Sequence, residues 1–276
     1  MINIYTVHYI KPEFIELQVR LFKKFCLDDY CLNIINNGYL DMELKISEIS
    51  KDLGVNCISL PEKSPHQFQS HSHAFALEHV IQNIIKKDNS SDVTVIIDSD
   101  VFPFKEFSFI EILNGKLIGG MYQQRDDYEY VSSIITIFKN DIDLKHFTIH
   151  GMADTGSGTN LLIKKYGCEF IKHTAAIDIE SDYVFRDNKQ LYPYDSKYRC
   201  QFIHDCFIHY YRGSNWAESD LNYHKTKYEF VKFFIDNYKL YYLNLDENVC
   251  YDKAQSNKGY NGSDHNYKNY KYINNK

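Results

Sequence analysis

The sequence lacks several features that would place the protein in a common class. No run of about 18 consecutive apolar residues is present, so we expect no membrane-spanning helix. Residues 1–10 lack the basic and apolar stretches of a signal peptide. The 7 cysteines form no CxxC pair, and we interpret them as reduced thiols in a cytoplasmic protein. A net charge of −6 disfavours nucleic acid as the main partner, because duplex-binding surfaces are usually basic.

Two motifs of nucleotide-binding proteins are also missing. Neither GxxxxGK[ST] nor a complete GxGxxG occurs, which argues against a nucleoside-triphosphate site or a dinucleotide site. The balance of 44% hydrophobic and 25% charged residues is that of an ordinary globular protein. The abundance of Asn, Lys, Ile and Tyr is typical of AT-rich genomes, including those of large DNA viruses, and hints at a viral source.

The first hundred residues alternate between strand and helix patterns. Helical spacing of apolar residues covers 13–25, 42–53 and 72–86, and short apolar or β-branched runs cover 2–10, 31–35, 55–60 and 93–97. This alternation predicts an α/β fold with a mixed, mostly parallel sheet flanked by helices. Ligands of such sheets bind beyond the carboxyl ends of the strands.

The second half of the chain mixes the two patterns. We expect helices at 107–114 and 155–166 and within 221–242, and strands at 117–122, 132–138, 169–173 and 201–211. One domain is expected over residues 1–245, because 276 residues suffice for one large α/β domain. The polar segment 246–276 is expected to be a weakly ordered tail.

Two carboxylates follow the apolar run at 93–97. The chain continues directly into Asp98, Ser99 and Asp100, and if the strand persists to Asp100 both carboxylates lie on one side of it. Oxygen ligands suit Mg²⁺ or Mn²⁺. The alternative is a polar turn, since Asp-Ser-Asp is common in loops. The buried strand before the pair and the Val-Phe-Pro segment after it favour a metal site.

This segment resembles the DxD region of GT-A glycosyltransferases, which have a Rossmann-like fold. The resemblance implies that Asp98 contacts the metal or the ribose, that Ser99 lies at the nucleotide, and that Asp100 binds the metal. Residues 4–9 are similar to the family's first strand, whose end holds the base and ribose. The resemblance therefore divides the domain into a nucleotide-binding half, 1–103, and a sugar and acceptor half, 104–245. The candidate nucleotide contacts outside the DxD region are Thr6, His8, Tyr9, Asn37 and His73.

Residues 207–216 are similar to the His-x-x-Gly-x-x-x-Pro-Trp segment of family 8 glycosyltransferases. The likeness implies that His209 is a metal ligand, that Arg212, Gly213 and Ser214 hold the diphosphate, and that Trp216 lies at the acceptor. Because Ser-Asn replaces the Lys-Pro before the Trp, a family 2-like enzyme stays open. His209 could instead be a hydrogen-bonded residue at a strand end.

A zinc site is a further alternative reading of the segment around His209. It would use Cys200, His204, Cys206 and His209. We disfavour it, because on one continuous strand His209 would point away from the other three.

Two weaker candidates complete the site. Asp154 precedes a predicted helix and could deprotonate an acceptor hydroxyl, or it could simply cap the helix. Gln123, Gln124 and Arg125 follow a predicted strand and could contact the donor sugar, or they could form a solvated turn.

The combined hypothesis is a Mn²⁺- or Mg²⁺-dependent glycosyltransferase. It would move a sugar from a nucleotide-diphosphate donor, with UDP-sugars favoured, to a hydroxyl of a glycan or other acceptor. Inversion and retention both stay open, because Asp154 favours the first and the His209 segment the second. The alternatives are a metal-dependent nucleotidyl- or phosphotransferase and a non-catalytic carbohydrate-binding protein.

Overall fold

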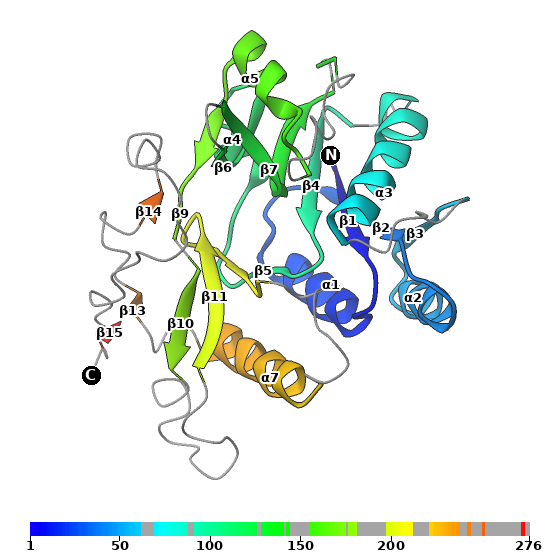
Figure 1. The fold of residues 1–276 in the computed structure, drawn as a ribbon, viewed down its shortest axis with the longest axis vertical. Coiled ribbons are helices and arrows are strands. Elements are labelled where there is room, and N and C mark those ends of the chain that lie inside the picture. Colours follow the sequence, from blue (N-terminus) through cyan, green and yellow to red (C-terminus); the bar gives the residue numbers. More distant parts are fainter. Residues whose placement is uncertain are drawn as a thin grey trace.

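Two larger sheets meet near the middle of the molecule, and helices pack against both of them (Figure 1). The computed structural model describes residues 1–61, 69–87, 91–125, 128–140, 142–143, 155–174, 176–180, 197–211, 221–237, 242–243, 250–251 and 272–273.

The first sheet has seven strands in the order β3-β2-β1-β4-β7-β6-β8. Its strands all run parallel except β7, which is antiparallel to both β4 and β6. The predicted α/β fold with a mixed, mostly parallel sheet is therefore confirmed. The strands are β1 (Ile2–His8), β2 (Tyr30–Asn36), β3 (Asn56–Ser59), β4 (Val93–Asp98), β6 (Ile118–Arg125), β7 (Tyr128–Lys139) and β8 (Glu169–Ile171).

Helices cover both faces of this sheet, which explains why its central strands β1 and β4 are buried along almost their whole length. Along β1, Ile4 joins one hydrophobic cluster with α1, whereas Tyr5 and Val7 join a second cluster with α3. Successive side chains of a strand point to opposite faces, so a strand covered on both sides needs apolar residues at nearly every position. The helices are α1 (Glu13–Phe25), α2 (Asp41–Asp52), α3 (Gln69–Asn83), the 3₁₀ turn η1 (Ile85–Lys87), α4 (Phe109–Leu113), α5 (Thr159–Tyr166) and α7 (Leu221–Asn237).

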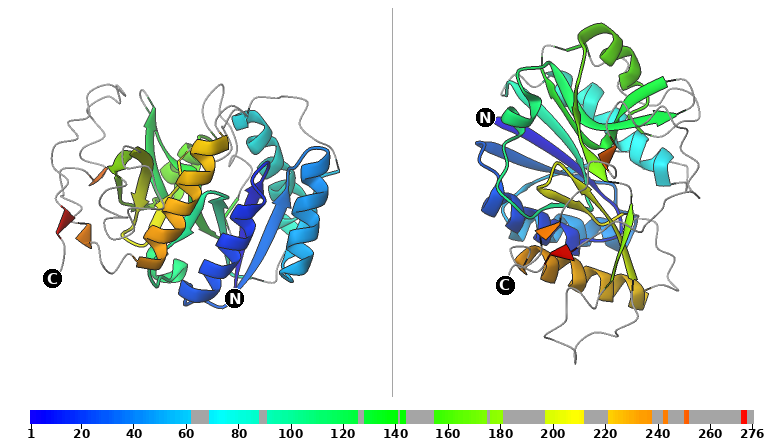
Figure 2. Two further views of the ribbon diagram at one scale, coloured as in Figure 1. Left: turned by 90° about the horizontal axis from the view of Figure 1, so that it is seen from below. Right: turned by 90° about the vertical axis from the view of Figure 1, so that its left-hand side faces the viewer.

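Helices α1 and α7 lie side by side although they come from opposite ends of the chain (Figure 2). The Tyr228 hydroxyl donates to the Glu13 carbonyl at 3.0 Å, and His224 Nε2 lies 2.7 Å from the Glu13 carboxylate. None of the helices in the described part of the chain has the length and apolar character needed to cross a bilayer.

The second sheet includes β5, the strand that follows β4 in the chain. Its strands run in the order β14-β9-β11-β12-β5, and β10 pairs with β11 beside this path. Strand β5 follows β4 after only two residues, so the chain passes from one sheet to the other there. The strands are β5 (Val101–Pro103), β9 (His173–Thr174), β10 (Ile177–Glu180), β11 (Lys197–Ile203), β12 (Phe207–His209) and β14 (Cys250–Tyr251); β13 (Tyr242–Leu243) and β15 (Tyr272–Ile273) pair separately.

Two predicted strands are each divided in the structure, and the condition that β4 persists to Asp100 is not met. Strand β4 ends at Asp98, so Asp100 lies in a turn instead of continuing the strand. The expected strand at 201–211 is a hairpin of β11 and β12, with His204 and Asp205 at positive φ in its turn. The expected strand at 169–173 is two short strands, β8 and β9, which belong to different sheets. In all three places the chain changes direction, and the sequence pattern does not reveal the turn.

Candidate metal site

The junction of the two sheets carries three side chains that could hold a metal ion. Asp98 is the last residue of β4, Asp100 lies in the turn into β5, and His209 is the last residue of β12. Because β12 pairs antiparallel with β5 and places His209 opposite Val101, the histidine lies beside the Asp98–Asp100 turn. The backbone N–H of Tyr210 donates to the Asp100 carbonyl at 2.7 Å and fixes this approach.

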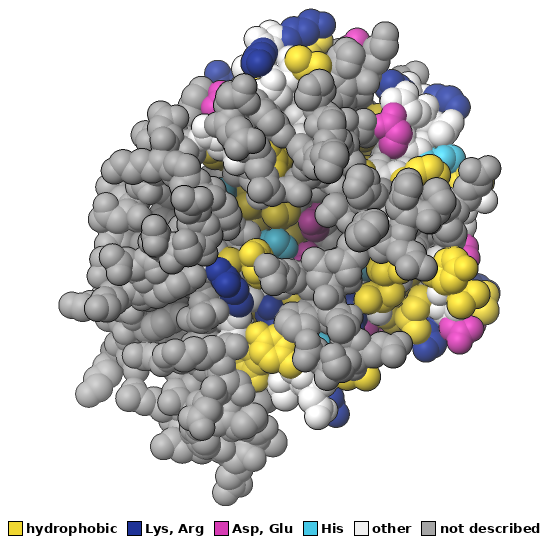
Figure 3. Space-filling view, viewed as in Figure 1, with side chains coloured by type: hydrophobic (Ala, Val, Ile, Leu, Met, Phe, Trp, Pro, Cys, Tyr) yellow, Lys and Arg dark blue, Asp and Glu magenta, His cyan; other side chains and the backbone are white. Residues whose placement is uncertain are grey.

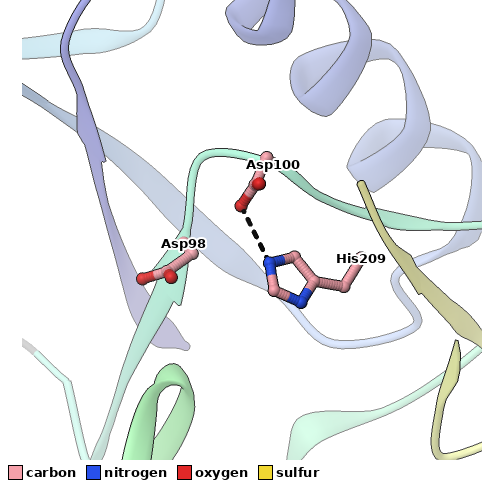
Figure 4. A group of neighbouring side chains, drawn as sticks. All are labelled: Asp98, Asp100 and His209. Atoms are coloured by element: carbon pink, nitrogen blue, oxygen red, sulfur yellow. Dashed lines mark ion pairs between the residues drawn. The ribbon is translucent and has the colours of Figure 1, made fainter. Parts of the chain in front are cut away.

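The geometry of the three groups is that of a compact ligand set. One ligand atom from each residue lies within 4.8 Å of the others, and His209 Nε2 is 3.3 Å from Asp100 Oδ1 (Figure 4). Among the described residues, no other group of three His, Cys, Asp or Glu side chains is gathered in this way, so the zinc alternative around Cys200 and Cys206 has no support there. Figure 3 shows acidic and histidine side chains together in a hollow near the middle of one face.

The electrostatics of Asp98 fit a cation at this place. Burial is the main cause of a raised pKa of Asp98; His73 opposes this effect and the nearby Asp100 adds to it. Its Oδ1 atom is buried and accepts no hydrogen bond from the residues that the structure describes, while His73 Nε2 lies 3.5 Å away. A buried carboxylate oxygen beside a second carboxylate is stabilised by a positive charge. The two carboxylates offer the oxygen ligands that suit Mg²⁺ and Mn²⁺, and the imidazole offers a nitrogen ligand beside them.

A buried glutamine supports the turn that carries the carboxylates. Gln18 of α1 is fully buried, and its Nε2 donates to the carbonyls of Asp98 at 2.9 Å and Val101 at 3.1 Å. Its Oε1 accepts from the Thr6 hydroxyl at 3.2 Å and lies 3.1 Å from His8 Nε2. Through Gln18, hydrogen bonds therefore connect α1 and the end of β1 to the backbone of this turn.

The described hydrogen-bond contacts of the Thr6 and His8 side chains are with this glutamine and with each other, at 3.4 Å between Thr6 Oγ1 and His8 Nε2. Both side chains are fully buried, and they share the face of β1 that packs on α1. Burial lowers the pKa of His8 to about 4, so the ring is neutral near physiological pH. Direct contact of these two residues with a nucleotide stays a prediction.

The other predicted nucleotide contacts lie at the carboxyl ends of the central strands. Asn37 follows β2 and donates from Nδ2 to the Ser72 hydroxyl at 2.9 Å, which ties β2 to α3. His73 of α3 is brought to Asp98, as noted above. Tyr9 and Ser99 are partly exposed at the ends of β1 and β4. The structure thus gathers these residues at one edge of the sheet, and their roles stay predictions.

The remaining predicted site residues either form hydrogen bonds within β6 and β7 or lie outside the described part of the chain. Gln123 Oε1 accepts from the Tyr130 hydroxyl at 2.6 Å and Gln124 Oε1 accepts from the Tyr122 hydroxyl at 3.3 Å, both within or between β6 and β7. The backbone of Arg125 ends β6, and its side chain lies outside the described residues. The other predicted residues outside the described part of the chain are Asp154, Arg212, Gly213, Ser214 and Trp216.

Two residues of this region were not predicted from the sequence. Gln18 lies in the apolar stripe of α1, between Phe14 and Leu21, and a polar residue at such a position is a usable signal. Gln201 of β11 lies opposite His209 and contacts it, as described below. It gives no comparable signal, because its place depends on a hairpin that the sequence does not reveal.

Comparison with known proteins finds likeness at the level of the fold alone. No protein-family model matches the chain, and no curated protein sequence matches it. Solved structures with a similar fold include a mannosyltransferase from Pyrobaculum calidifontis in complex with GDP-Man and Mn²⁺ (TM-score 0.41, 10% identity, 61% of this chain and 54% of that chain). The galactosyltransferase LgtC, in complex with donor and acceptor sugar analogues, gives a TM-score of 0.40 at 7% identity, over 61% of this chain and 72% of LgtC.

A nucleoside-diphosphate-sugar pyrophosphorylase from Vibrio cholerae is also similar, with a TM-score of 0.36 at 12% identity, over 62% of this chain and 91% of that one. The chain spans about half of the length of the mannosyltransferase. All three likenesses are distant and concern the fold alone.

Proposed function

We propose that the protein is a metal-dependent glycosyltransferase of GT-A type, which transfers a sugar from a nucleotide-diphosphate donor to a hydroxyl acceptor. The observation that carries the proposal is the convergence of Asp98, Asp100 and His209 at the carboxyl end of β4. Ligands of α/β sheets bind at that edge, and two carboxylates there fit a divalent cation better than any uncharged ligand. Bound there, Mn²⁺ would neutralise charge on the departing nucleoside diphosphate.

The donor would lie across the ends of β1, β2 and β4. Tyr9, Asn37 and His73 lie at this edge, and Gln18 fixes the Asp98–Asp100 turn by a hydrogen bond to its backbone. The diphosphate-binding role of residues 212–214 and the base role of Asp154 remain part of the proposal on the strength of the sequence. UDP-sugars are the donors to test first.

The test is titration calorimetry with Mn²⁺ followed by a panel of UDP-, GDP- and dTDP-sugars, including GDP-mannose. Wild-type protein should bind Mn²⁺, and one donor class should bind only when Mn²⁺ is present. Asp100→Asn should lose both events. Asp92→Asn is the matched control, because Asp92 is exposed at the opposite end of β4 and should leave both events unchanged.

Product analysis separates this proposal from its competitors. A glycosyltransferase releases a nucleoside diphosphate as the sugar is transferred, or slowly when water is the acceptor. Release of pyrophosphate from a nucleoside triphosphate and a sugar phosphate would instead indicate a nucleotidyltransferase. Correctly folded protein that binds no nucleotide in any combination would refute an enzymatic role of this kind.

A further inference from the structure

A chain of hydrogen bonds runs from the backbone of β9 to the imidazole of His209. Three neighbouring strands carry it in the order β9, β11 and β12. Gln201 of β11 stands opposite His209 of β12 in the antiparallel register, and its Oε1 lies 3.0 Å from His209 Nδ1. The Gln201 amide also contacts the Thr174 carbonyl at 2.9 Å and His173 Nδ1 at 3.1 Å. All four residues are buried.

The Thr174 carbonyl determines which way the Gln201 amide faces. A carbonyl oxygen only accepts hydrogen bonds, so the Gln201 atom 2.9 Å from it must be the NH₂ group. The opposite orientation would place two oxygens against each other at that distance. The amide oxygen of Gln201 therefore faces His209.

His173 lies at the β9 end of this network. Its Nε2 is 2.8 Å from the Tyr122 carbonyl, and its Nδ1 is 3.0 Å from the Thr174 carbonyl, the same oxygen that accepts from the Gln201 amide. Because both ring nitrogens of His173 face carbonyl oxygens, the orientation of Gln201 rests on the Thr174 carbonyl.

The orientation of Gln201 has a direct consequence for the metal site. Its Oε1 can only accept, so His209 Nδ1 must carry a hydrogen and donate it. A histidine that binds a metal ion is neutral and has one N–H, so its lone pair is then on Nε2, the atom 3.3 Å from Asp100 Oδ1. In this form the Nε2 lone pair and the carboxylate face each other, and a cation between them would offset their repulsion.

We propose that Gln201 is a positioning residue that holds His209 in the Nδ1–H tautomer and thereby presents a ready Nε2 lone pair to a divalent cation shared with Asp98 and Asp100. This inference rests on the proposed function for the cation and on the described hydrogen bonds for the tautomer. Without Gln201, His209 could place its proton on Nε2 and donate to Asp100, and a cation would then have to displace that hydrogen bond. Metal-ligating histidines commonly depend on such a partner at the second ring nitrogen.

The first experiment reads the tautomer without any metal. Metal-free protein labelled with ¹⁵N in histidine gives two-bond ¹⁵N–¹H correlations that distinguish an Nδ1–H from an Nε2–H ring, and the His209 signals are assigned by their absence in His209→Gln. We expect His209 to be the Nδ1–H tautomer near neutral pH. An Nε2–H ring in the wild-type protein would overturn the inference whatever the metal does.

Variants then test whether Gln201 is the cause. Gln201→Leu removes the acceptor and should give a mixed or Nε2–H ring, together with a Mn²⁺ dissociation constant about 10- to 100-fold larger by calorimetry. Gln201→Glu keeps an acceptor oxygen toward His209 in either protonation state and should retain the Nδ1–H tautomer. Thr94→Val is the matched control, because it removes the 2.7 Å hydrogen bond to Asn140 near the far end of β4.

The outcomes separate a positioning role from a purely structural one. Loss of stability without a change in tautomer or Mn²⁺ affinity in Gln201→Leu would refute the role assigned to Gln201. If Gln201→Leu does not fold, the wild-type and Gln201→Glu spectra still decide the tautomer. An Nδ1–H ring in a protein that binds no Mn²⁺ would uphold the tautomer and refute the metal-dependent function.

Discussion

Replacing Gln18 by leucine should destabilise the protein and loosen the candidate metal site together. The substitution keeps the volume of the side chain but removes the hydrogen bonds of four groups to Gln18: the carbonyls of Asp98 and Val101, the Thr6 hydroxyl and His8 Nε2. Thr6 and His8 then keep only their long mutual contact of 3.4 Å. Because each buried group left unpaired costs about 1 kcal/mol or somewhat more, we expect the free energy of unfolding to fall by roughly 3–5 kcal/mol.

The assay is urea denaturation at neutral pH, with Mn²⁺ calorimetry on the folded variant. We expect Mn²⁺ affinity to fall about tenfold, since two of the lost bonds hold the turn that carries the carboxylates. Gln18→Glu retains the acceptor oxygen for Thr6 and His8 but loses the NH₂ group that donates to the carbonyls of Asp98 and Val101. It therefore tests the contribution of the donated hydrogen bonds separately. Gln82→Leu is the control on α3, where the glutamine contacts Glu78 and Lys86 near the surface. A loss of less than about 1 kcal/mol in Gln18→Leu would refute the reasoning.

Three further predictions follow from the fold and the site. Because the pKa of His8 is about 4 when folded and 6.5 in its unperturbed state, unfolded chains bind more protons between these values. The free energy of unfolding should therefore fall by about 3 kcal/mol as the pH drops from 6.5 to 4, and pH-dependent urea curves of His8→Gln should lack this component. Gly120→Ala should cost about 3 kcal/mol in thermal or urea denaturation, since φ is +151° and a Cβ would lie 2.3 Å from the Ile135 carbonyl. Gly115→Ala, at φ +73° with open space around it, should cost only about 1 kcal/mol. Mn²⁺ at a hundred times its dissociation constant should raise the free energy of unfolding by about 2.7 kcal/mol in the wild type. A comparable rise in Asp100→Asn would contradict the assigned ligand set.

The elements that could be predicted are those specified by local pattern. The predicted helix 13–25 coincides with α1, because its apolar spacing is regular and Pro12 precedes it. The apolar run at 93–97 is the buried β4, and both faces of that strand are covered, as such a run requires. The proximity of Asp98 and Asp100 is confirmed, although a turn brings it about instead of a continued strand.

The elements that could not be predicted depend on contacts between distant segments. The turn of the β11–β12 hairpin contains His204 and Asp205 in the left-handed region, where glycine or asparagine would be the expected signal. The pairing of β5 with β12 joins residues 101–103 to residues 207–209, and no local pattern records it. The role of Gln201 depends on that register, so it becomes visible only in the folded chain. The predicted division of 1–245 into two halves stays a prediction.

The placement of the metal-site residues on two sheets also bears on how the protein matures. Asp98 and Asp100 leave the ribosome long before His209, and loop-closure entropy must be overcome before β12 can pair with β5. The N-terminal strands and helices can therefore begin to assemble during synthesis, whereas the three candidate ligands come together only after most of the chain has emerged. If the proposed metal role holds, binding of the ion would mark completion of the tertiary structure.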